Sequence, residues 1–149
     1  MSDELILLVE DNADDEALTM RAFGKNRLHA KIEVVRDGPE ALDYLFCQGP
    51  FSNRDPFRVP RVVLLDINLP KLSGLEVLRR LRKDPRTKLL PIVILTSSNE
   101  EEDLLNGYQL GVNSYIRKPV DYNAFMEAVK QLGVYWLSLN QCVPVNAKR

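Results

Sequence analysis

The sequence predicts an α/β fold with a doubly wound sheet of five parallel strands. Short runs rich in apolar and β-branched residues recur five times, and a stretch with helical periodicity follows each of them. Two of these runs, 62–65 and 92–95, are apolar throughout, which is typical of central strands covered on both faces. Alternating strands and helices favour right-handed crossovers, and binding sites in such sheets form at the carboxyl ends of the strands.

The five strands are predicted from composition and alternation. The first is an unbroken apolar run, the second alternates charged and apolar residues, and the fifth is shorter than the others. The predicted ranges are 5–9, 31–35, 62–65, 92–95 and 114–116.

Amphipathic periodicity predicts five helices, at 14–25, 38–47, 74–83, 99–110 and 121–138. Asn99 is a favourable N-cap for the fourth helix, with Glu102 three positions later. Gly111 is expected to end that helix in a left-handed conformation. The polar segment from 48 to 60, which contains proline and glycine, is predicted to be a long surface loop.

Length and composition exclude several classes of protein. A chain of 149 residues suits one compact domain. With 20 basic and 21 acidic residues it predicts no basic surface for nucleic acid. Two cysteines, Cys47 and Cys142, and one histidine, His29, support neither a disulfide framework nor a zinc site. No leader and no apolar run long enough to span a bilayer are present, so we expect a cytoplasmic protein without membrane partners.

Polar side chains follow four of the five strands. Glu10 and Asp11 come after the first strand, Asp66 after the third, Thr96 after the fourth and Lys118 after the fifth. Because the carboxyl ends of parallel strands meet at one edge of a sheet, these five side chains are expected to converge there.

Three carboxylates held together repel one another, and a bound divalent cation would offset this repulsion. Oxygen ligands with open positions suit Mg²⁺. Asp66 can then act as a nucleophile toward a phosphoryl group, while the metal and Lys118 offset the charge on its oxygens. Thr96 supplies a hydroxyl donor to the product. The added charge can draw Thr96 and Lys118 inward, so the site is expected to work as a switch.

Each of these residues also has an ordinary interpretation when taken alone. Asp11 could cap the first helix, Thr96 could stabilise a turn, Lys118 could be a solvated surface lysine, and Tyr115 could be half-buried packing. An acid that closes a run as apolar as 62–65 is harder to explain in this way. The occurrence of all of them on successive strand ends favours the functional interpretation.

The motifs resemble those of receiver domains, the phosphoacceptor domains of response regulators in two-component signalling. The resemblance covers about residues 5 to 138 and is specific. It is carried by 9–12 (VEDN), 64–70 (LLDINLP), Gly74, 95–97 (LTS), 111–112 (GV) and 115–119 (YIRKP). It implies the flavodoxin-like (βα)5 arrangement.

The resemblance implies a role for each residue at the strand ends. Asp66 would accept a phosphoryl group from a sensor histidine kinase. Asp11, Asp66 and the main-chain carbonyl of Asn68 would bind Mg²⁺ or Mn²⁺, and Glu10 would help through water. Glu10–Asp11 is a variant of the commoner Asp–Asp pair. Lys118, together with Thr96, would contact the phosphoryl group.

The resemblance also implies two features of the switch. Thr96 and Tyr115 would be paired switch residues. The peptide bond between Lys118 and Pro119 is commonly cis in the family, so a cis bond is expected here.

Within the family, the segment 46–60 and the aromatic tail resemble the small stand-alone regulators that are paired with cyanobacterial phytochrome kinases. A phytochrome-type kinase is therefore the expected partner. We expect a single receiver domain over 1–149, with a core of about 5–138, an extension at 139–149 and no effector domain.

Output is then expected to pass through a downstream protein that the sequence does not identify, and through homodimerisation. Val134, Tyr135, Trp136 and Leu137 offer more apolar area than one helix face can bury, which makes them candidates for a dimer contact. The alternative is that the extended last helix folds back on its own core.

Three other classes of protein share part of this pattern. Phosphatases of the haloacid-dehalogenase type resemble this site but need a second aspartate as proton donor, and Asn68 occupies that position. A flavodoxin-like cofactor module would need hydroxyls or glycines in its first loop, where this chain has acids. A structural pseudo-receiver usually lacks the acceptor or the lysine. The site is therefore expected to be a signalling switch that assists its own phosphorylation and dephosphorylation, and not an enzyme with turnover.

Overall fold

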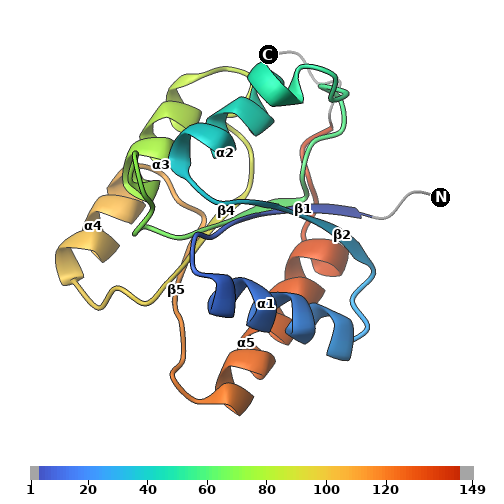
Figure 1. Ribbon diagram of the computed structural model, residues 1–149, viewed down its shortest axis with the longest axis vertical. Coiled ribbons are helices and arrows are strands. Elements are labelled where there is room, and N and C mark those ends of the chain that lie inside the picture. The colour runs from blue at the N-terminus through green and yellow to red at the C-terminus, as the bar shows by residue number, and fades with distance from the viewer. Residues whose placement is uncertain (1–3, 145–149) are drawn as a thin grey trace.

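The apolar runs of the sequence form one parallel sheet in the computed structural model, which describes residues 4–144 (Figure 1). The strand order is β2-β1-β3-β4-β5 and every neighbouring pair is parallel. The strands are β1 (Glu4–Val9), β2 (Ala30–Val35), β3 (Val62–Leu65), β4 (Ile92–Thr96) and β5 (Ser114–Arg117). The predicted fold class is confirmed.

The sheet is buried on both faces because its central strands present apolar side chains to each side in turn. Leu7 and Val9 of β1 point into one core cluster, whereas Ile6 and Leu8 point into the other. All residues of β3 and β4 are buried as well. The continuous apolar runs of the sequence are therefore explained by two cores, one under each helical layer.

The helices cover these two faces. In Figure 1, α1 and α5 lie on one side of the sheet, and α2, α3 and α4 on the other. Their bounds are α1 (Ala13–Lys25), α2 (Gly38–Leu45), α3 (Gly74–Lys83), α4 (Glu101–Gln109) and α5 (Tyr122–Val134). A 3-10 turn at Gly49–Phe51 and a π-helical turn at Tyr135–Leu139 complete the elements.

The start of α4 differs from the prediction. Its N-cap is Glu100, which makes no side-chain cap hydrogen bond, so the assignment of Asn99 as N-cap was wrong. Ser98 stabilises this end instead: its Oγ accepts a hydrogen bond from the backbone N–H of Glu100 and donates one to Asp103 Oδ2 at 2.6 Å. At the other end, Gly111 has a φ of 97°, which confirms the expected left-handed residue.

The loop after α2 is ordered by one arginine. The guanidinium of Arg54 lies 3.8 Å from the ring centroid of Tyr44. It donates hydrogen bonds to Cys47 Sγ and to the carbonyl of Arg58, at 3.3 and 2.8 Å. The ring of Phe51 packs edge-on against Tyr44. The segment 48–60 is thus a surface loop fastened to α2.

In the C-terminal turn, one of the residues expected at a dimer contact, Trp136, is buried. Trp136 is only 9% exposed and belongs to the core cluster under α1 and α5, and Leu137 packs against the same cluster. Arg61, at the start of β3, donates hydrogen bonds to the carbonyl oxygens of Leu137 and Asn140 and so fastens this turn. Trp136 is therefore not available for a dimer contact, whereas Tyr135 is 47% exposed.

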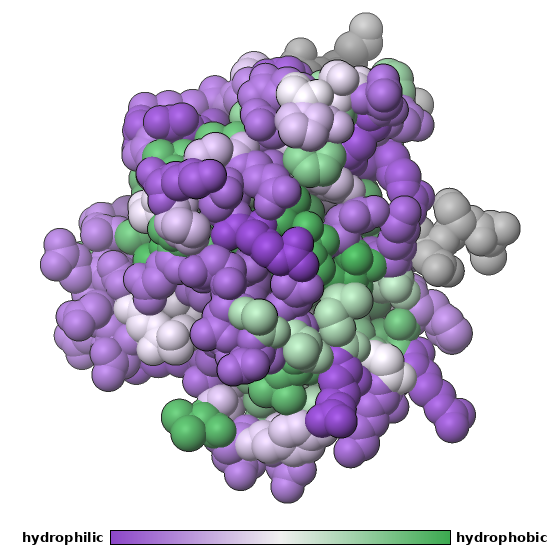
Figure 2. All heavy atoms as spheres, viewed as in Figure 1, coloured by the Kyte–Doolittle hydropathy of each residue, from purple (hydrophilic) through white to green (hydrophobic). Residues whose placement is uncertain are grey.

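The surface seen in Figure 2 is mostly hydrophilic, and hydrophobic residues appear on it in small patches. No helix in residues 4–144 is both long and apolar enough to cross a membrane.

Candidate functional site

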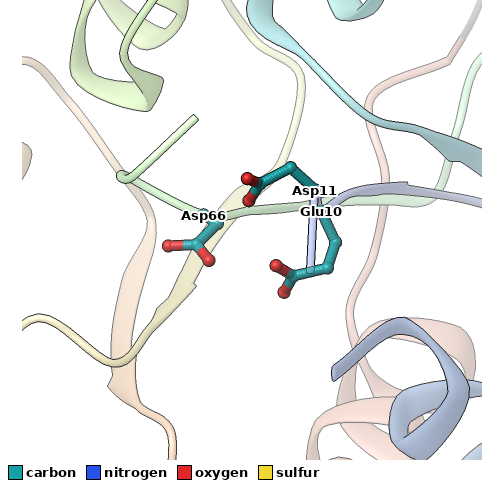
Figure 3. A group of neighbouring side chains, drawn as sticks. All are labelled: Glu10, Asp11 and Asp66. Atoms are coloured by element: carbon teal, nitrogen blue, oxygen red, sulfur yellow. The ribbon is translucent and has the colours of Figure 1, made fainter. Parts of the chain in front are cut away.

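The register of the sheet brings the polar strand ends together. Val9 pairs with Leu65, and Leu65 pairs with Ile94, so the residues that follow β1, β3 and β4 emerge at one edge. Glu10, Asp11 and Asp66 gather there (Figure 3). The convergence that the sequence predicted is present.

The acidic residues form a cluster that suits a divalent cation. Glu10, Asp11 and Asp66 each offer one carboxylate oxygen, and these oxygens lie within 4.8 Å of one another. Glu10 is 2% exposed and Asp66 is 6% exposed, while Asp11 lies open to solvent. Carboxylate oxygens on one open side are the donors that Mg²⁺ and Mn²⁺ prefer, so the residues fit such an ion.

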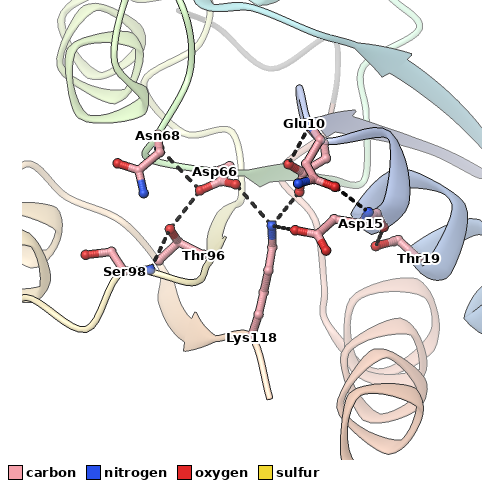
Figure 4. Close-up of polar contacts among 9 residues, drawn as sticks. Glu10, Asp15, Thr19, Asp66, Asn68, Thr96, Ser98 and Lys118 are labelled. Atoms are coloured by element: carbon pink, nitrogen blue, oxygen red, sulfur yellow. Dashed lines mark hydrogen bonds and ion pairs between the residues drawn. The ribbon is translucent and has the colours of Figure 1, made fainter. Parts of the chain in front are cut away.

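Lys118 lies at the centre of the site (Figure 4). Its Nζ donates to Glu10 Oε1 at 2.6 Å, to Asp15 Oδ2 at 2.8 Å and to Asp66 Oδ2 at 3.0 Å. The side chain is 6% exposed. Because an ammonium group has three hydrogens, this arrangement uses all of them.

The charges of the site are not balanced. Burial raises the pKa of Glu10 to about 7, and the charge of Asp66 adds to this, while Lys118 opposes it. Burial alone would lower the pKa of Lys118, but its contacts with Asp15 and Glu10 raise it above its ordinary value. Lys118 is therefore held as a cation, and the surplus negative charge makes the site able to take up a proton or a cation.

Thr96 holds the other side of the Asp66 carboxylate. Its Oγ1 donates a hydrogen bond to Asp66 Oδ1 at 2.7 Å, and Thr96 is fully buried. The backbone N–H of Asn68 donates to the same Oδ1 at 3.3 Å, and that of Ser98 donates to Thr96 Oγ1 at 3.3 Å. One oxygen of Asp66 is thus bound by β4 and the other by the lysine that follows β5.

Tyr115 lies beside this site in β5. Its ring is 6.5 Å from that of Tyr108 in α4, and Gly107 leaves room for the Tyr115 ring. The hydroxyl oxygen is buried and makes no well-aligned hydrogen bond with any described residue, although Ser98 is close. Burial raises the pKa of Tyr115. A buried hydroxyl without a well-aligned hydrogen bond can gain free energy by moving to a better partner.

Gly74 sets the position of the phosphoacceptor loop. A Cβ at this position would lie 2.0 Å from the backbone oxygen of Asp66 and 2.9 Å from Cα of Ile67. The backbone N–H of Gly74 donates to the Ile67 carbonyl at 2.8 Å. Only glycine allows α3 to start this close to the end of β3.

The expected cis bond before Pro119 was wrong. No peptide bond among residues 4–144 is cis, so Lys118–Pro119 is trans. The backbone N–H of Lys118 donates to the carbonyl of Thr96 at 2.7 Å, which continues the strand pairing. The trans form is also the lower-energy isomer before proline, and the lysine reaches Asp66 from it.

Asp15 is a site residue that the sequence did not predict. It lies in the first turn of α1, whereas the predicted site residues were those that directly follow a strand. Its backbone N–H donates to Asn12 Oδ1 at 3.0 Å, and the signal in the sequence is therefore that of an ordinary helix start. Only the packing of α1 over the strand ends shows that its carboxylate faces Lys118.

Comparisons with known proteins agree with this geometry. The model of the response regulator receiver domain family matches residues 6–130. The probable methanogenesis regulatory protein FilR2 of Methanothrix harundinacea is 40% identical over 92% of this chain and 86% of its own length. The response regulator Rcp1 of Synechocystis sp. is 35% identical over 92% of this chain and 95% of its own length.

Two solved structures are similar throughout. The Mn²⁺-bound form of Rcp1 has a TM-score of 0.86 at 33% identity, covering 94% of this chain and 99% of that one. The phosphorylated cyanobacterial phytochrome response regulator RcpA has a TM-score of 0.87 at 37% identity, covering 95% and 99%. The chain therefore belongs to the receiver domain family of response regulators, with phytochrome response regulators among its relatives.

Proposed function

We propose that this protein is a response regulator in which Asp66 accepts a phosphoryl group from a histidine kinase of the phytochrome type. The observation that carries the proposal is the setting of the Asp66 carboxylate. It is buried at the edge of an acidic cluster, with Thr96 bound to one oxygen and Lys118 to the other. We expect the protein to act in the cytoplasm.

The chemistry follows from these contacts. A carboxylate oxygen of Asp66 forms a bond to phosphorus as the N–P bond of a phosphohistidine breaks, and its electron pair returns to the imidazole. Negative charge then lies on the transferred oxygens, where the hydroxyl of Thr96 and the ammonium of Lys118 can donate hydrogen bonds. A divalent ion bound by Glu10, Asp11, Asp66 and the Asn68 carbonyl would neutralise part of that charge.

The same contacts provide a switch. Thr96 and Lys118 bind different oxygens of Asp66 before transfer, so a phosphoryl group on Asp66 displaces at least one of these hydrogen bonds. Thr96 then turns to a phosphoryl oxygen. Tyr115, whose hydroxyl lacks a well-aligned partner, can then move closer to Ser98. The signal therefore reaches α4 and β5 first.

The transfer is tested by incubating the protein with acetyl phosphate and measuring its intact mass. We expect one added phosphoryl group that requires both Mg²⁺ and Asp66, and none on Asp66→Asn. The absence of any adduct on the unchanged protein would favour a structural pseudo-receiver. Rapid release of phosphate without an adduct would favour a phosphatase.

The choice of kinase is supported by relatives. RcpA is described as a phytochrome response regulator and is 37% identical. FilR2, a probable methanogenesis regulatory protein, is 40% identical, so the proposed kinase rests on the relatives that are phytochrome response regulators. The test is the rate of phosphotransfer from an autophosphorylated bacterial phytochrome kinase, with a kinase that has no phytochrome module as control. Equal rates from both would contradict the proposed pairing.

Homodimerisation remains part of the proposal, with a narrower surface than the sequence predicted. Val134, Tyr135 and Leu139 are exposed in the C-terminal segment, whereas Trp136 is not. Sedimentation velocity of the free and phosphorylated protein tests this, and Tyr135→Ala should weaken association. A monomer in both states would contradict the proposed dimer. The signal would then have to be passed on by binding to an unidentified downstream protein.

A further inference from the structure

Lys118 is held by a residue that belongs to neither the acidic cluster nor a strand end. Asp15 approaches from the first turn of α1, and its Oδ2 lies 2.8 Å from Lys118 Nζ. This is closer than the 3.0 Å between Nζ and Asp66 Oδ2. The contact joins α1 to the residue that follows β5, and the Lys118 nitrogen lies between the carboxylates of Asp15 and Asp66 (Figure 4).

The three partners of Lys118 differ in whether they also take part in binding the cation or the phosphoryl group. Glu10 and Asp66 are also members of the carboxylate cluster that suits a divalent ion, and Asp66 is the proposed acceptor. The carboxylate of Asp15 lies outside that cluster, and Lys118 is its partner. Of the three, only Asp15 is free to keep its contact throughout the reaction.

We propose that Asp15 is a positioning residue that keeps the Lys118 ammonium beside Asp66 while Glu10 and Asp66 are engaged by the cation and the phosphoryl group. The inference rests on the proposed function of Asp66. With Asp15 in place, Lys118 gives one hydrogen to Asp15 and can turn another to a phosphoryl oxygen. Without Asp15, nothing fixed on α1 holds the ammonium when the other partners change.

A competing explanation is that Asp15 serves only the start of α1, where negative charge is favourable. The chain offers a matched control for this. Asp14 lies in the same turn and carries the same charge, but it is exposed and its carboxylate has no hydrogen-bond or ion-pair partner among residues 4–144. The backbone contacts of Asp15 with Asn12 and Thr19 do not involve its carboxylate and survive a change to asparagine.

The test compares Asp15→Asn, Asp14→Asn and Asp15→Glu with the unchanged protein. The first readout is the ¹⁵N NMR signal of the Lys118 ammonium in metal-free protein, which is visible when the group is buried and hydrogen-bonded. The second is the rate of phosphorylation by acetyl phosphate at saturating Mg²⁺. Urea midpoints are measured in parallel, so that loss of fold is recognised.

We expect Asp15→Asn to broaden or remove the ammonium signal and to slow phosphorylation about tenfold, the usual effect of losing one charge-assisted hydrogen bond. Asp14→Asn should keep the signal and stay within about twofold of the unchanged rate. Asp15→Glu, which retains a carboxylate, should keep the ammonium signal that Asp15→Asn loses.

Two results would overturn the inference alone: Asp15→Asn behaving like Asp14→Asn, or Asp15→Asn reacting faster than the unchanged protein, which would mean that Asp15 withdraws the lysine. Failure of the unchanged protein to accept a phosphoryl group would instead overturn the proposed function and the role of Asp15 in it together.

Discussion

Replacing Glu10 by glutamine should stabilise the metal-free protein at alkaline pH, even though the change removes a partner of Lys118. Glu10 is 2% exposed, and burial raises its pKa from 4.5 to about 7. The folded state therefore prefers the protonated acid, while the unfolded chain ionises near pH 4.5. Stability from this group is fully present below pH 4.5 and is lost as the pH rises to 7.

The size of the effect follows from the shift. The rise in the pKa of Glu10 from 4.5 to about 7 corresponds to a cost of about 3 kcal/mol, which is reached above pH 7. Glutamine avoids this cost but no longer attracts Lys118, which keeps Asp15 and Asp66. We therefore expect Glu10→Gln to gain about 1–3 kcal/mol over the unchanged protein at pH 8 and about zero at pH 4.5.

The assay is urea unfolding in EDTA at pH 4.5, 6 and 8. Glu102→Gln makes the same chemical change at an exposed position of α4 and serves as the control. A Glu10→Gln protein that is less stable than the unchanged protein at pH 8 would refute the reasoning, because it would show that pairing with Lys118 outweighs the burial of Glu10.

Three further predictions concern the metal, the acceptor loop and the C-terminal turn. Mg²⁺ should raise the melting temperature of the unchanged protein more at pH 8 than at pH 6, because protons compete for Glu10 below its pKa of about 7; an equal shift at both pH values in differential scanning calorimetry would count against this. Gly74→Ala should lower the free energy of unfolding by about 2 kcal/mol or more, since its Cβ would overlap the backbone oxygen of Asp66; an unchanged urea midpoint would show that the loop can yield. Trp136→Ala should lose about 3–5 kcal/mol in urea unfolding, against about 1 kcal/mol for Tyr135→Ala, and similar losses would contradict the core assignment of the tryptophan.

The fold was predictable because its strongest signals are local. The runs at 62–65 and 92–95 are too apolar for any place but the centre of a covered sheet, and parallel order follows from the alternation with helices. Once the strands are placed, the residues after them must meet, which explains why Glu10, Asp66, Thr96 and Lys118 could be found from the sequence.

The errors come from side-chain contacts that the preferences of single residues do not show. The C-terminal aromatic residues look like surplus surface until Arg61, far away in the sequence, is seen to fasten the last turn over the core. The start of α4 depends on Ser98 reaching Asp103, which outweighs the local preference for Asn99 as a cap. The sequence position of Asp15 indicates only a helix start, and its contact with Lys118, 103 residues away, depends on the packing of α1.

The hydrogen bonds around Asp66 also explain why one side of the sheet should carry the signal. Thr96 Oγ1 donates to Asp66 and accepts from the backbone N–H of Ser98, and Ser98 in turn donates through its Oγ to Asp103 in the first turn of α4. A group added to Asp66 that turns Thr96 therefore disturbs the start of α4 within two further hydrogen bonds. The loop on the β2 side is fastened separately, by contacts of Arg54 with the backbone of Tyr44 and with Cys47. Because each link in the relay joins neighbouring groups, phosphorylation of Asp66 would reach the start of α4 through these hydrogen bonds.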